Sequence, residues 1–177
     1  MSTLSVDTIQ GQTTAANVKL PAGCVLQTLS TTKTDAFSTS ATGPIDITGL
    51  SVVITPKYAT SKIFIMFTVH IVGYDSGTGI RLLRGSTALA LGDTSGSRAR
   101  MTAIGFYSNG ASPNTYSGGN TSMSFLDSPA TTSATTYKLQ AQCLSTNGIV
   151  VNKTRYDTDN GNASRGSSTI TVMEIAQ

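Results

Sequence analysis

Hydrophobic and polar residues alternate along most of this chain in short runs, separated by Gly, Pro, Asn and Asp. Alternation with a period of two predicts half-buried strands, and turn-forming residues end them. Thr, Val and Ile are frequent in the runs, and no segment has the hydrophobic period of a helix. We predict strands over residues 24–32, 45–55, 62–72, 80–84, 87–91, 100–107, 121–126, 135–144, 149–152 and 169–175.

Nine or ten short strands at this spacing predict an all-β fold, an antiparallel β-sandwich or jelly roll. Gly85-Ser86 predicts a hairpin turn or bulge between strands 80–84 and 87–91. Asn147-Gly148 is typical of a tight hairpin and predicts that 149–152 pairs with 135–144. Within 135–144 the alternation predicts an inward face of Tyr137, Leu139, Ala141 and Cys143.

The strand Lys62–Val72 differs from the others because both of its faces are largely apolar. A sandwich strand has one core face and one wet face, so a second apolar face needs a cover. We predict that another subunit covers it, and the alternative cover is the loop 108–120. The predicted subunit interface consists of Phe64, Met66, His70 and Val72.

Residues 1–22 differ from the rest of the chain, because they form a polar stretch with only a few isolated apolar residues. Such a segment cannot form a core of its own. We predict an extended arm that needs a partner surface, with Leu4, Val6 and Ile9 as its anchors, rather than a loose terminus. The sandwich domain then covers residues 23–177.

The composition of the chain argues against several classes of function. Charged residues make up 12% of the chain, against about 25% in average soluble domains, and the net charge is +3. The arginines are scattered rather than gathered in a basic stripe, which argues against nucleic-acid binding. The longest apolar run is too short to span a membrane. The start of the chain lacks a secretory signal, which predicts synthesis and assembly in a cytoplasm.

Few residues are suited to catalysis. His70 is the single histidine and lies within a strand, and no nucleophile elbow or phosphate-binding loop is present. Cys24 and Cys143 lie in apolar runs and are expected to be buried thiols, although their pairing stays open. We predict no catalytic, cofactor or metal site; a carboxylate pair of the glycosidase type is the alternative.

The segment 157–162 resembles the start of a calcium loop, but Gly161 and Ser168 stand where acidic or amide ligands are expected. A polar turn is the favoured interpretation, and cation binding there stays open.

Two polar loops, 107–120 and 155–165, are rich in Tyr, Asn and Asp. Flat rings and short amides on rigid β loops suit recognition of sugars or proteins, although ordinary solvated loops have the same composition. The candidate receptor contacts are Tyr107, Asn109, Tyr116, Arg155, Tyr156 and Asp157.

Several segments resemble structural proteins of marine bacteriophages, of the cyanophage type. They are the opening residues 4–11 and 18–23, the closing residues 168–175, and the internal residues 56–63, 83–86 and 125–131. The resemblance covers most of the chain, but its motifs are structural rather than chemical.

This resemblance implies a virion protein of the tail-fibre, head-fibre or decoration type, with a trimeric jelly-roll head like those of tumour necrosis factor and C1q. It implies an arm that docks on other virion proteins and a distal head that contacts the host surface. It carries no catalytic residues, and the usual long shaft is missing. A fibre or knob appendage is favoured; a capsid decoration protein, a tail adaptor and, from another class, an adhesin that binds a host surface glycan are the alternatives.

Overall fold

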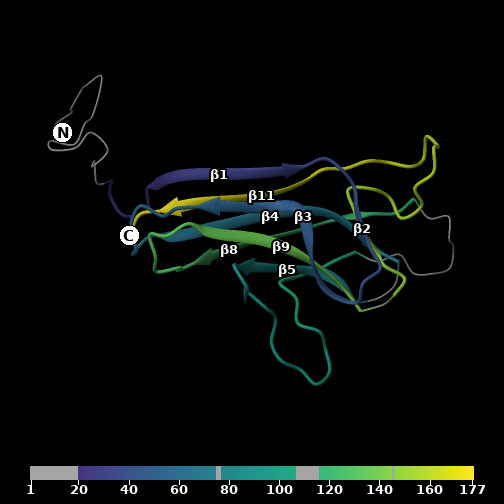
Figure 1. Ribbon diagram of the computed structural model, residues 1–177, viewed down its shortest axis with the longest axis horizontal. Helices are drawn as coiled ribbons and strands as arrows, with labels where there is room; N and C mark the ends of the chain where they lie inside the picture. The colour runs from purple at the N-terminus through teal and green to yellow at the C-terminus, as the bar shows by residue number, and fades with distance from the viewer. Residues whose placement is uncertain (1–19, 75–76, 107–115, 145) are drawn as a thin grey trace, which may run out of the picture.

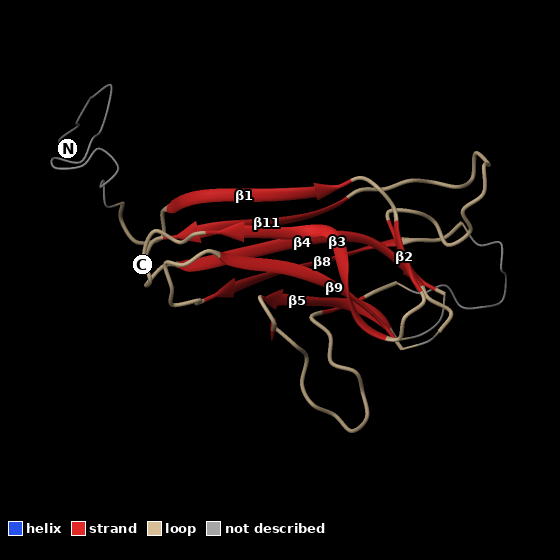
Figure 2. Ribbon diagram, viewed as in Figure 1, coloured by secondary structure: helices blue, strands red, loops and turns tan. Residues whose placement is uncertain are grey.

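The computed structural model describes residues 20–74, 77–106, 116–144 and 146–177. Within these ranges all regular structure is β, with eleven strands in two antiparallel sheets that face each other (Figures 1 and 2). The prediction of an all-β fold with two antiparallel sheets is therefore confirmed. The arm anchors Leu4, Val6 and Ile9 lie outside the described residues.

The first sheet, sheet A, has β4 at its centre. Its strands lie side by side in the order β1 (Val25–Lys33), β11 (Ser168–Ile175), β4 (Lys62–Gly73) and β8 (Gly119–Asp127). Beyond the start of β11, the short β10 (Ile149–Val151) pairs with the last residues of β4, and β2 (Phe37–Thr39) pairs with β10.

The second sheet, sheet B, has β9 and β5 at its centre. Its order is β3 (Gly43–Ile54), β9 (Thr135–Cys143) and β5 (Thr78–Arg84), and β5 then pairs with both β6 (Thr87–Leu89) and β7 (Ala103–Ile104).

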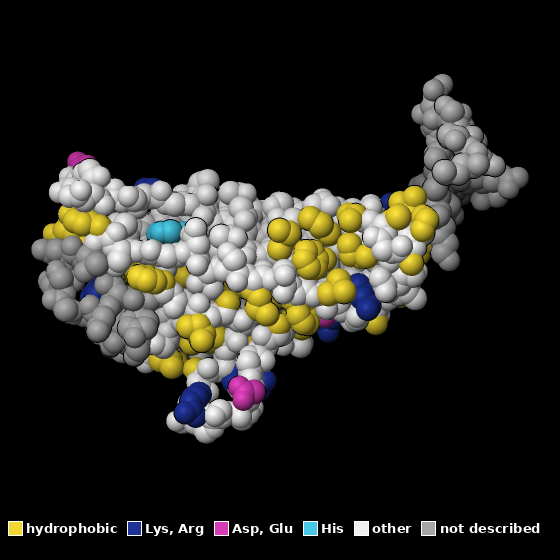
Figure 3. All heavy atoms as spheres, turned by 180° about the vertical axis from the view of Figure 1, so that it is seen from behind, with side chains coloured by type: hydrophobic (Ala, Val, Ile, Leu, Met, Phe, Trp, Pro, Cys, Tyr) yellow, Lys and Arg dark blue, Asp and Glu magenta, His cyan; other side chains and the backbone are white. Residues whose placement is uncertain are grey.

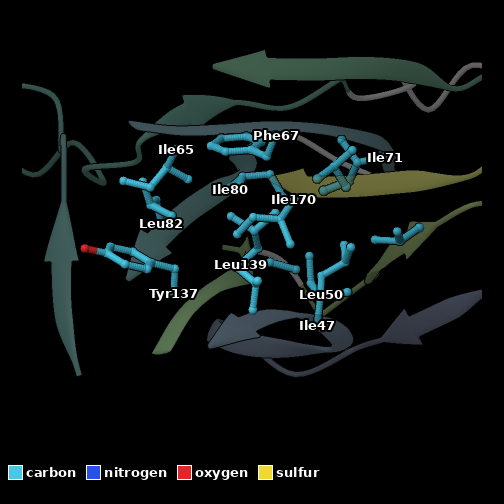
Figure 4. Packing of buried hydrophobic residues seen from close by; sticks show 14 of the residues in the cluster. Ile47, Leu50, Ile65, Phe67, Ile71, Ile80, Leu82, Tyr137, Leu139 and Ile170 are labelled. Carbon is cyan, nitrogen blue, oxygen red and sulfur yellow. The ribbon is translucent and has the colours of Figure 1, made fainter. Parts of the chain in front are cut away.

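Alternate side chains of both sheets fill the space between them. The inward face predicted for β9 is confirmed, because Tyr137, Leu139, Ala141 and Cys143 are all at most 1% exposed. From sheet A, the inward face of β4 packs against them, with Ile65 and Phe67 close to Leu82 and Ile80 of β5 (Figure 4). Each such side chain contributes about 1.5–3 kcal/mol of hydrophobic stabilisation, so this layer holds the two sheets together.

The two predicted turns have different outcomes. The Gly85-Ser86 hairpin is confirmed, since Arg84 pairs with Thr87 across it. The Asn147-Gly148 hairpin is wrong: β9 is already paired on both sides, by β3 and β5, so the chain crosses to sheet A and β10 pairs with β4 and β2. Gly148 has a φ of +93°, and a Cβ there would lie 2.8 Å from the Thr39 carbonyl oxygen.

Another difference concerns the predicted strand 100–107, of which only Ala103–Ile104 forms a ladder. Just before this ladder, a side chain bridges two other strands: Thr102 Oγ1 accepts a hydrogen bond from Leu82 N (2.9 Å) and donates one to Leu89 O (2.8 Å). This hydroxyl links β5 to β6, which also pair directly at Leu82 and Leu89. The three-residue β2 was not predicted, because a run of Phe, Ser and Thr this short has no periodicity.

The sandwich has two distinct ends. At one end, the base, the start of the described chain pairs with its C-terminus through hydrogen bonds between Gly23 N and Ala176 O and between Ala176 N and Cys24 O, each 2.9 Å. β4 runs from Lys62 at the base to Gly73 at the opposite end, the tip, a length of roughly 40 Å at 3.3 Å per residue (Figure 1).

A buried asparagine ties the strands of sheet A together near the tip. Asn152 is fully buried and its Nδ2 donates to the carbonyl oxygens of Lys33 (2.8 Å) and Asp35 (3.0 Å), while its Oδ1 accepts from Ser168 Oγ (2.6 Å). Ser168 Oγ in turn accepts from His70 N at 3.0 Å. One side chain therefore fixes the ends of β1, β4 and β10 and the start of β11 relative to one another.

Candidate binding surfaces

The outer face of sheet A carries the predicted subunit interface, and the structure divides it into two halves. Toward the base, Phe64 is half-buried and Met66 is 44% exposed. Toward the tip, His70 is half-buried and Val72 is 0% exposed. Val72 is thus covered by its own chain and is unavailable to a neighbour, which corrects that part of the prediction.

The base half of this face forms an apolar patch across three strands. Strand register places Leu126 of β8 and Met173 of β11 on either side of Phe64. We call Phe64, Met66, Leu126 and Met173 the face patch; Leu126 is 47% exposed. Figure 3 shows hydrophobic side chains gathered toward one end of the sandwich. Lys62 is the one charged residue that β4 adds to this outer face. An uncharged apolar patch of this kind marks an interaction surface.

Hydroxyl groups surround the face patch instead of charges. Ser30 and Thr171 hydrogen bond across β1 and β11 at 2.8 Å, and Thr68 and Ser122 do so across β4 and β8 at 2.9 Å. A shallow hollow of about 340 Å³ lies among Met66, Thr68, Ser124 and Thr171. Such a surface can be desolvated without burying an unpaired charge.

The tip half is covered by loops that close over His70. A Cβ on Gly118 would lie 2.6 Å from His70 Cε1, and one on Gly166 would lie 3.1 Å from His70 Cγ. Only glycine lets both loops approach the ring so closely. His70 Nδ1 is buried and has no hydrogen-bond partner in the described part of the chain. Burial lowers the pKa of this imidazole, and a hydrogen bond to its own backbone opposes the shift only in part.

The two long edges of the sandwich differ. Along the β1 and β3 edge, Gln27 Nε2 donates to Thr55 O and Thr31 Oγ1 donates to Ser51 O, each at 2.8 Å, so side chains of one sheet bind the backbone of the other. Along the β7 and β8 edge, Ile104 is 85% exposed and Phe106 is 45% exposed. We call Ile104 and Phe106 the edge patch. It is a second apolar surface, separate in the fold from the face patch.

The structure brings the two predicted receptor loops together at the tip. Rings of Tyr116 and Tyr156 meet edge to face with centroids 5.5 Å apart, and Arg155 N donates to Ser117 O at 3.2 Å. Tyr107 and Asn109 lie outside the described residues. Three of the candidate receptor contacts, Tyr116, Arg155 and Tyr156, thus lie close together, although nothing in the fold alone assigns them a ligand.

Tyr74 also belongs to this group and was not among the predicted contacts. Its hydroxyl donates to Arg155 O at 3.0 Å, and the Arg155 guanidinium lies over its ring, 5.0 Å from the centroid. Tyr74 follows β4 directly and is separated from the other tip residues by more than forty positions, so no sequence pattern linked them. We call Tyr74, Tyr116, Arg155 and Tyr156 the tip cluster.

Asp157 lies next to the tip cluster and is engaged in ion pairs. Its carboxylate pairs with Arg165 and with Lys153, the latter at 3.3 Å. The Arg165 guanidinium, and to a smaller extent Lys153, lowers the pKa of Asp157. Residues from Asp157 to Arg165 line a polar hollow of about 310 Å³. The described residues hold no cluster of three or more His, Cys, Asp or Glu side chains suited to a metal ion.

Asp127 and Asp157, two carboxylates that could have belonged to a glycosidase pair, lie far apart. Asp127 is near the base, 6% exposed, and accepts hydrogen bonds from Arg84 Nη1 (2.9 and 2.7 Å) and from the Tyr137 hydroxyl (2.6 Å). Burial, reinforced by Asp127, raises the pKa of Tyr137. Asp157 is at the tip, so the two cannot flank one bond, and Asp127 instead fixes β8 to β5 and β9.

Neither cysteine is in a disulfide. Cys143 is buried, and its thiol donates a hydrogen bond to Gly148 O at 3.6 Å, whereas Cys24 is half-buried. Among the described residues, no helix is long and hydrophobic enough to span a membrane.

Comparison with known protein families gives no match, and comparison with curated proteins gives none either.

Proposed function

We propose that this chain is a non-enzymatic structural protein of a bacteriophage virion, a fibre or knob appendage that forms a homotrimer. The observation that carries the proposal is the face patch: the centre of sheet A leaves Met66 and Leu126 exposed and Phe64 only partly covered by its own chain. Large exposed side chains on a surface with so few charges are typical of a protein that packs against copies of itself.

Strand order supports a jelly roll of the tumour-necrosis-factor and C1q type. With the short β2 and β10 set aside and β6 and β7 counted as one position, eight positions remain. The first strand, β1, lies beside the last, β11, in sheet A, and the second, β3, lies beside the seventh, β9, in sheet B. The third, β4, lies between the last and the sixth, β8. This nesting of early with late strands is the pattern of two Greek keys.

Two different apolar surfaces support a ring rather than a two-fold dimer. A two-fold interface uses the same patch on both subunits, whereas a ring joins one patch to a different patch on the next copy. The face patch and the edge patch are different surfaces on different strands. A trimer in which the edge patch of each copy covers the face patch of the next leaves no copy with either patch exposed.

The arm and the tip give the proposed trimer a direction. Residues 20–24 enter the sandwich at the base, so an arm of residues 1–22 with anchors Leu4, Val6 and Ile9 docks that end on other virion proteins. The tip cluster then points away from the virion and contacts the host surface. A capsid decoration protein or a tail adaptor uses the same base but needs no receptor at the tip.

A second candidate, from another class, is a glycan-binding adhesin. The observation in its favour is the tip cluster, where three tyrosine rings and an arginine from distant segments meet on one end of a rigid sandwich. Aromatic rings on loops are common in sugar sites. The two candidates differ in whether the protein is found in purified virions.

The test of this proposal measures the mass of the assembly in solution and the location of the chain on the virion. Light scattering of the purified chain at micromolar concentration is expected to give about 55 kDa, three times 18.3 kDa. Electron microscopy of virions with an antibody bound to residues of the 91–101 loop is expected to place the label on a projecting appendage. A monomer in solution contradicts the trimer, and unlabelled virions contradict the virion role.

A further inference from the structure

A small hollow at the tip lies apart from the two polar loops that the sequence singles out. It has a volume of about 330 Å³ and lies between β2, the residue that follows β4, and the turn before β10. Its lining includes Ser38, Thr39, Ser40, Tyr74, Asn147 and Gly148. The volume is at the lower end of the range for small-molecule sites, which fits one or two sugar rings.

The hollow is formed by groups that are held in place. Tyr74 is fixed at its backbone by a hydrogen bond from its N to Gly148 O (3.1 Å) and at its hydroxyl by the bond to Arg155 O. Arg155 stacks on the ring without lining the hollow. A ring held at both ends is pre-organised, so binding a ligand costs it little conformational entropy.

Glycine at position 148 allows the hollow to form. Its φ of +93° is a conformation that other residues rarely adopt, and its missing Cβ leaves 2.8 Å to Thr39 O. The turn can therefore approach β2 closely and bring Asn147 next to the hydroxyls of Ser38 and Ser40, both of which are exposed.

The chemistry of the lining selects the ligand class. None of the lining residues is acidic or basic, so a phosphate, carboxylate or ammonium group would find no opposite charge there. Hydroxyl and amide groups donate and accept hydrogen bonds, and an aromatic ring offers a flat apolar surface. A pyranose has the matching features: equatorial hydroxyls and an apolar face of C–H groups.

We propose that this hollow binds a neutral saccharide, whose C–H face lies on Tyr74 and whose hydroxyls bond to Ser38, Ser40 and Asn147. This inference rests on the proposed function in one respect, since the hollow meets a host surface only if the tip points away from the virion. Saccharide binding itself requires only the folded sandwich domain, so the saccharide site and the proposed virion role can fail separately.

The experiment is saturation-transfer NMR on the full chain with methyl glycosides of glucose, galactose, mannose and N-acetylglucosamine, and with N-acetylneuraminic acid and glucose 6-phosphate as charged probes. Irradiation of the tyrosine rings is expected to saturate the C–H protons of at least one neutral glycoside. Tyr74→Ala is expected to weaken binding at least tenfold and Tyr74→Phe to weaken it less. Tyr58→Ala, which removes a half-buried tyrosine at the base, is expected to change nothing.

Ser40→Arg provides a second variant at an exposed position if Tyr74→Ala does not fold, and it is expected to fill the hollow and abolish binding. The inference is overturned if no neutral glycoside receives saturation, if a charged probe receives more than the neutral glycosides, or if neither variant changes binding. A peptide ligand would produce the first of these outcomes. Light scattering on the same samples reports the trimer separately, so a trimer without sugar binding contradicts only this inference, and a sugar-binding monomer contradicts only the proposed assembly.

Discussion

The outer faces of the two sheets are opposite in character, although the same kind of strand builds both. Sheet A presents Phe64, Met66 and Leu126 among hydroxyls, whereas sheet B presents a polar network in which Asp46 binds Lys138 (2.7 Å) and Gln140 (2.8 Å). Charged groups are costly to desolvate and hydroxyl groups with partners are cheap. In the proposed assembly, sheet A is therefore the face that another copy covers, and sheet B is the face that remains in water.

The largest expected effect comes from placing a charge on each face in turn. Met66→Glu buries a carboxylate with no partner in the proposed interface, a penalty of about 3 kcal/mol or more per contact, so the trimer is expected to dissociate at micromolar concentration. Val53→Glu is the matched control, because Val53 is 54% exposed on the outer face of sheet B. Sedimentation velocity of both variants measures the difference, and equal behaviour of the two would remove the distinction between the faces.

A second test addresses the polar hub that fixes the tip half of sheet A. Asn152→Ala leaves the carbonyls of Lys33 and Asp35 and the hydroxyl of Ser168 without their partner, which is expected to cost about 3 kcal/mol of unfolding free energy. Asn152 has a φ of +61°, so Asn152→Gly removes the same bonds but relieves the backbone, and is expected to be less destabilising by about 1 kcal/mol. Urea titrations of the two variants give both numbers, and a loss below 1 kcal/mol for Asn152→Ala would show that the hub is dispensable.

A third test uses pH, which acts on sheet A through His70. Because burial holds the pKa of His70 below its ordinary value of about 6.5, the unfolded chain binds the proton more readily than the folded one. The contribution of His70 is therefore fully present above pH 6.5 and is lost as the pH falls from there through the folded-state pKa. Melting temperatures between pH 8 and pH 5 are expected to fall in the wild type and to fall less in His70→Gln. Identical slopes would mean that the folded and unfolded chains bind the proton on His70 equally well, so that burial does not lower its pKa.

The smallest effect is expected on sheet B. Lys138 and, to a smaller extent, Gln140 lower the pKa of Asp46, but the group is exposed to solvent. Asp46→Asn is therefore expected to cost about 0.5 kcal/mol of stability, an effect that shrinks as salt screens the ion pair. Thermal melts at low and high salt measure it, and a loss above 2 kcal/mol would show that the outer face of sheet B is more than a solvated surface.

The local pattern of hydrophobic and polar residues predicted the positions of most strands, but it could not predict which strands pair with each other. The alternation in 135–144 identified the inward side of β9, and the strong run 62–72 identified the central strand of sheet A. Asn147-Gly148 has hairpin composition, yet β9 had no free edge to pair with, and that fact depends on β3 and β5, which lie far away in the sequence.

The extent of the apolar outer face of β4 could be predicted only in part, for the same reason. Apolar residues on the second face of β4 predicted that this face needs a cover, but the pattern could not say which of these residues their own chain covers. Val72 is fully buried within its own chain, while Met66 stays exposed. Tyr74 shows the complementary case, since its role depends on contacts with Arg155 and Gly148 that no spacing encodes.

Methionine oxidation tests the central claim directly. Met66 is 44% exposed on a single subunit and belongs to the face patch. We expect mild peroxide at micromolar protein concentration to leave Met66 at least tenfold more protected than in a sample diluted until the trimer dissociates, while free methionine added to both samples is oxidised equally. Equal oxidation of Met66 at both concentrations would mean that no copy covers sheet A.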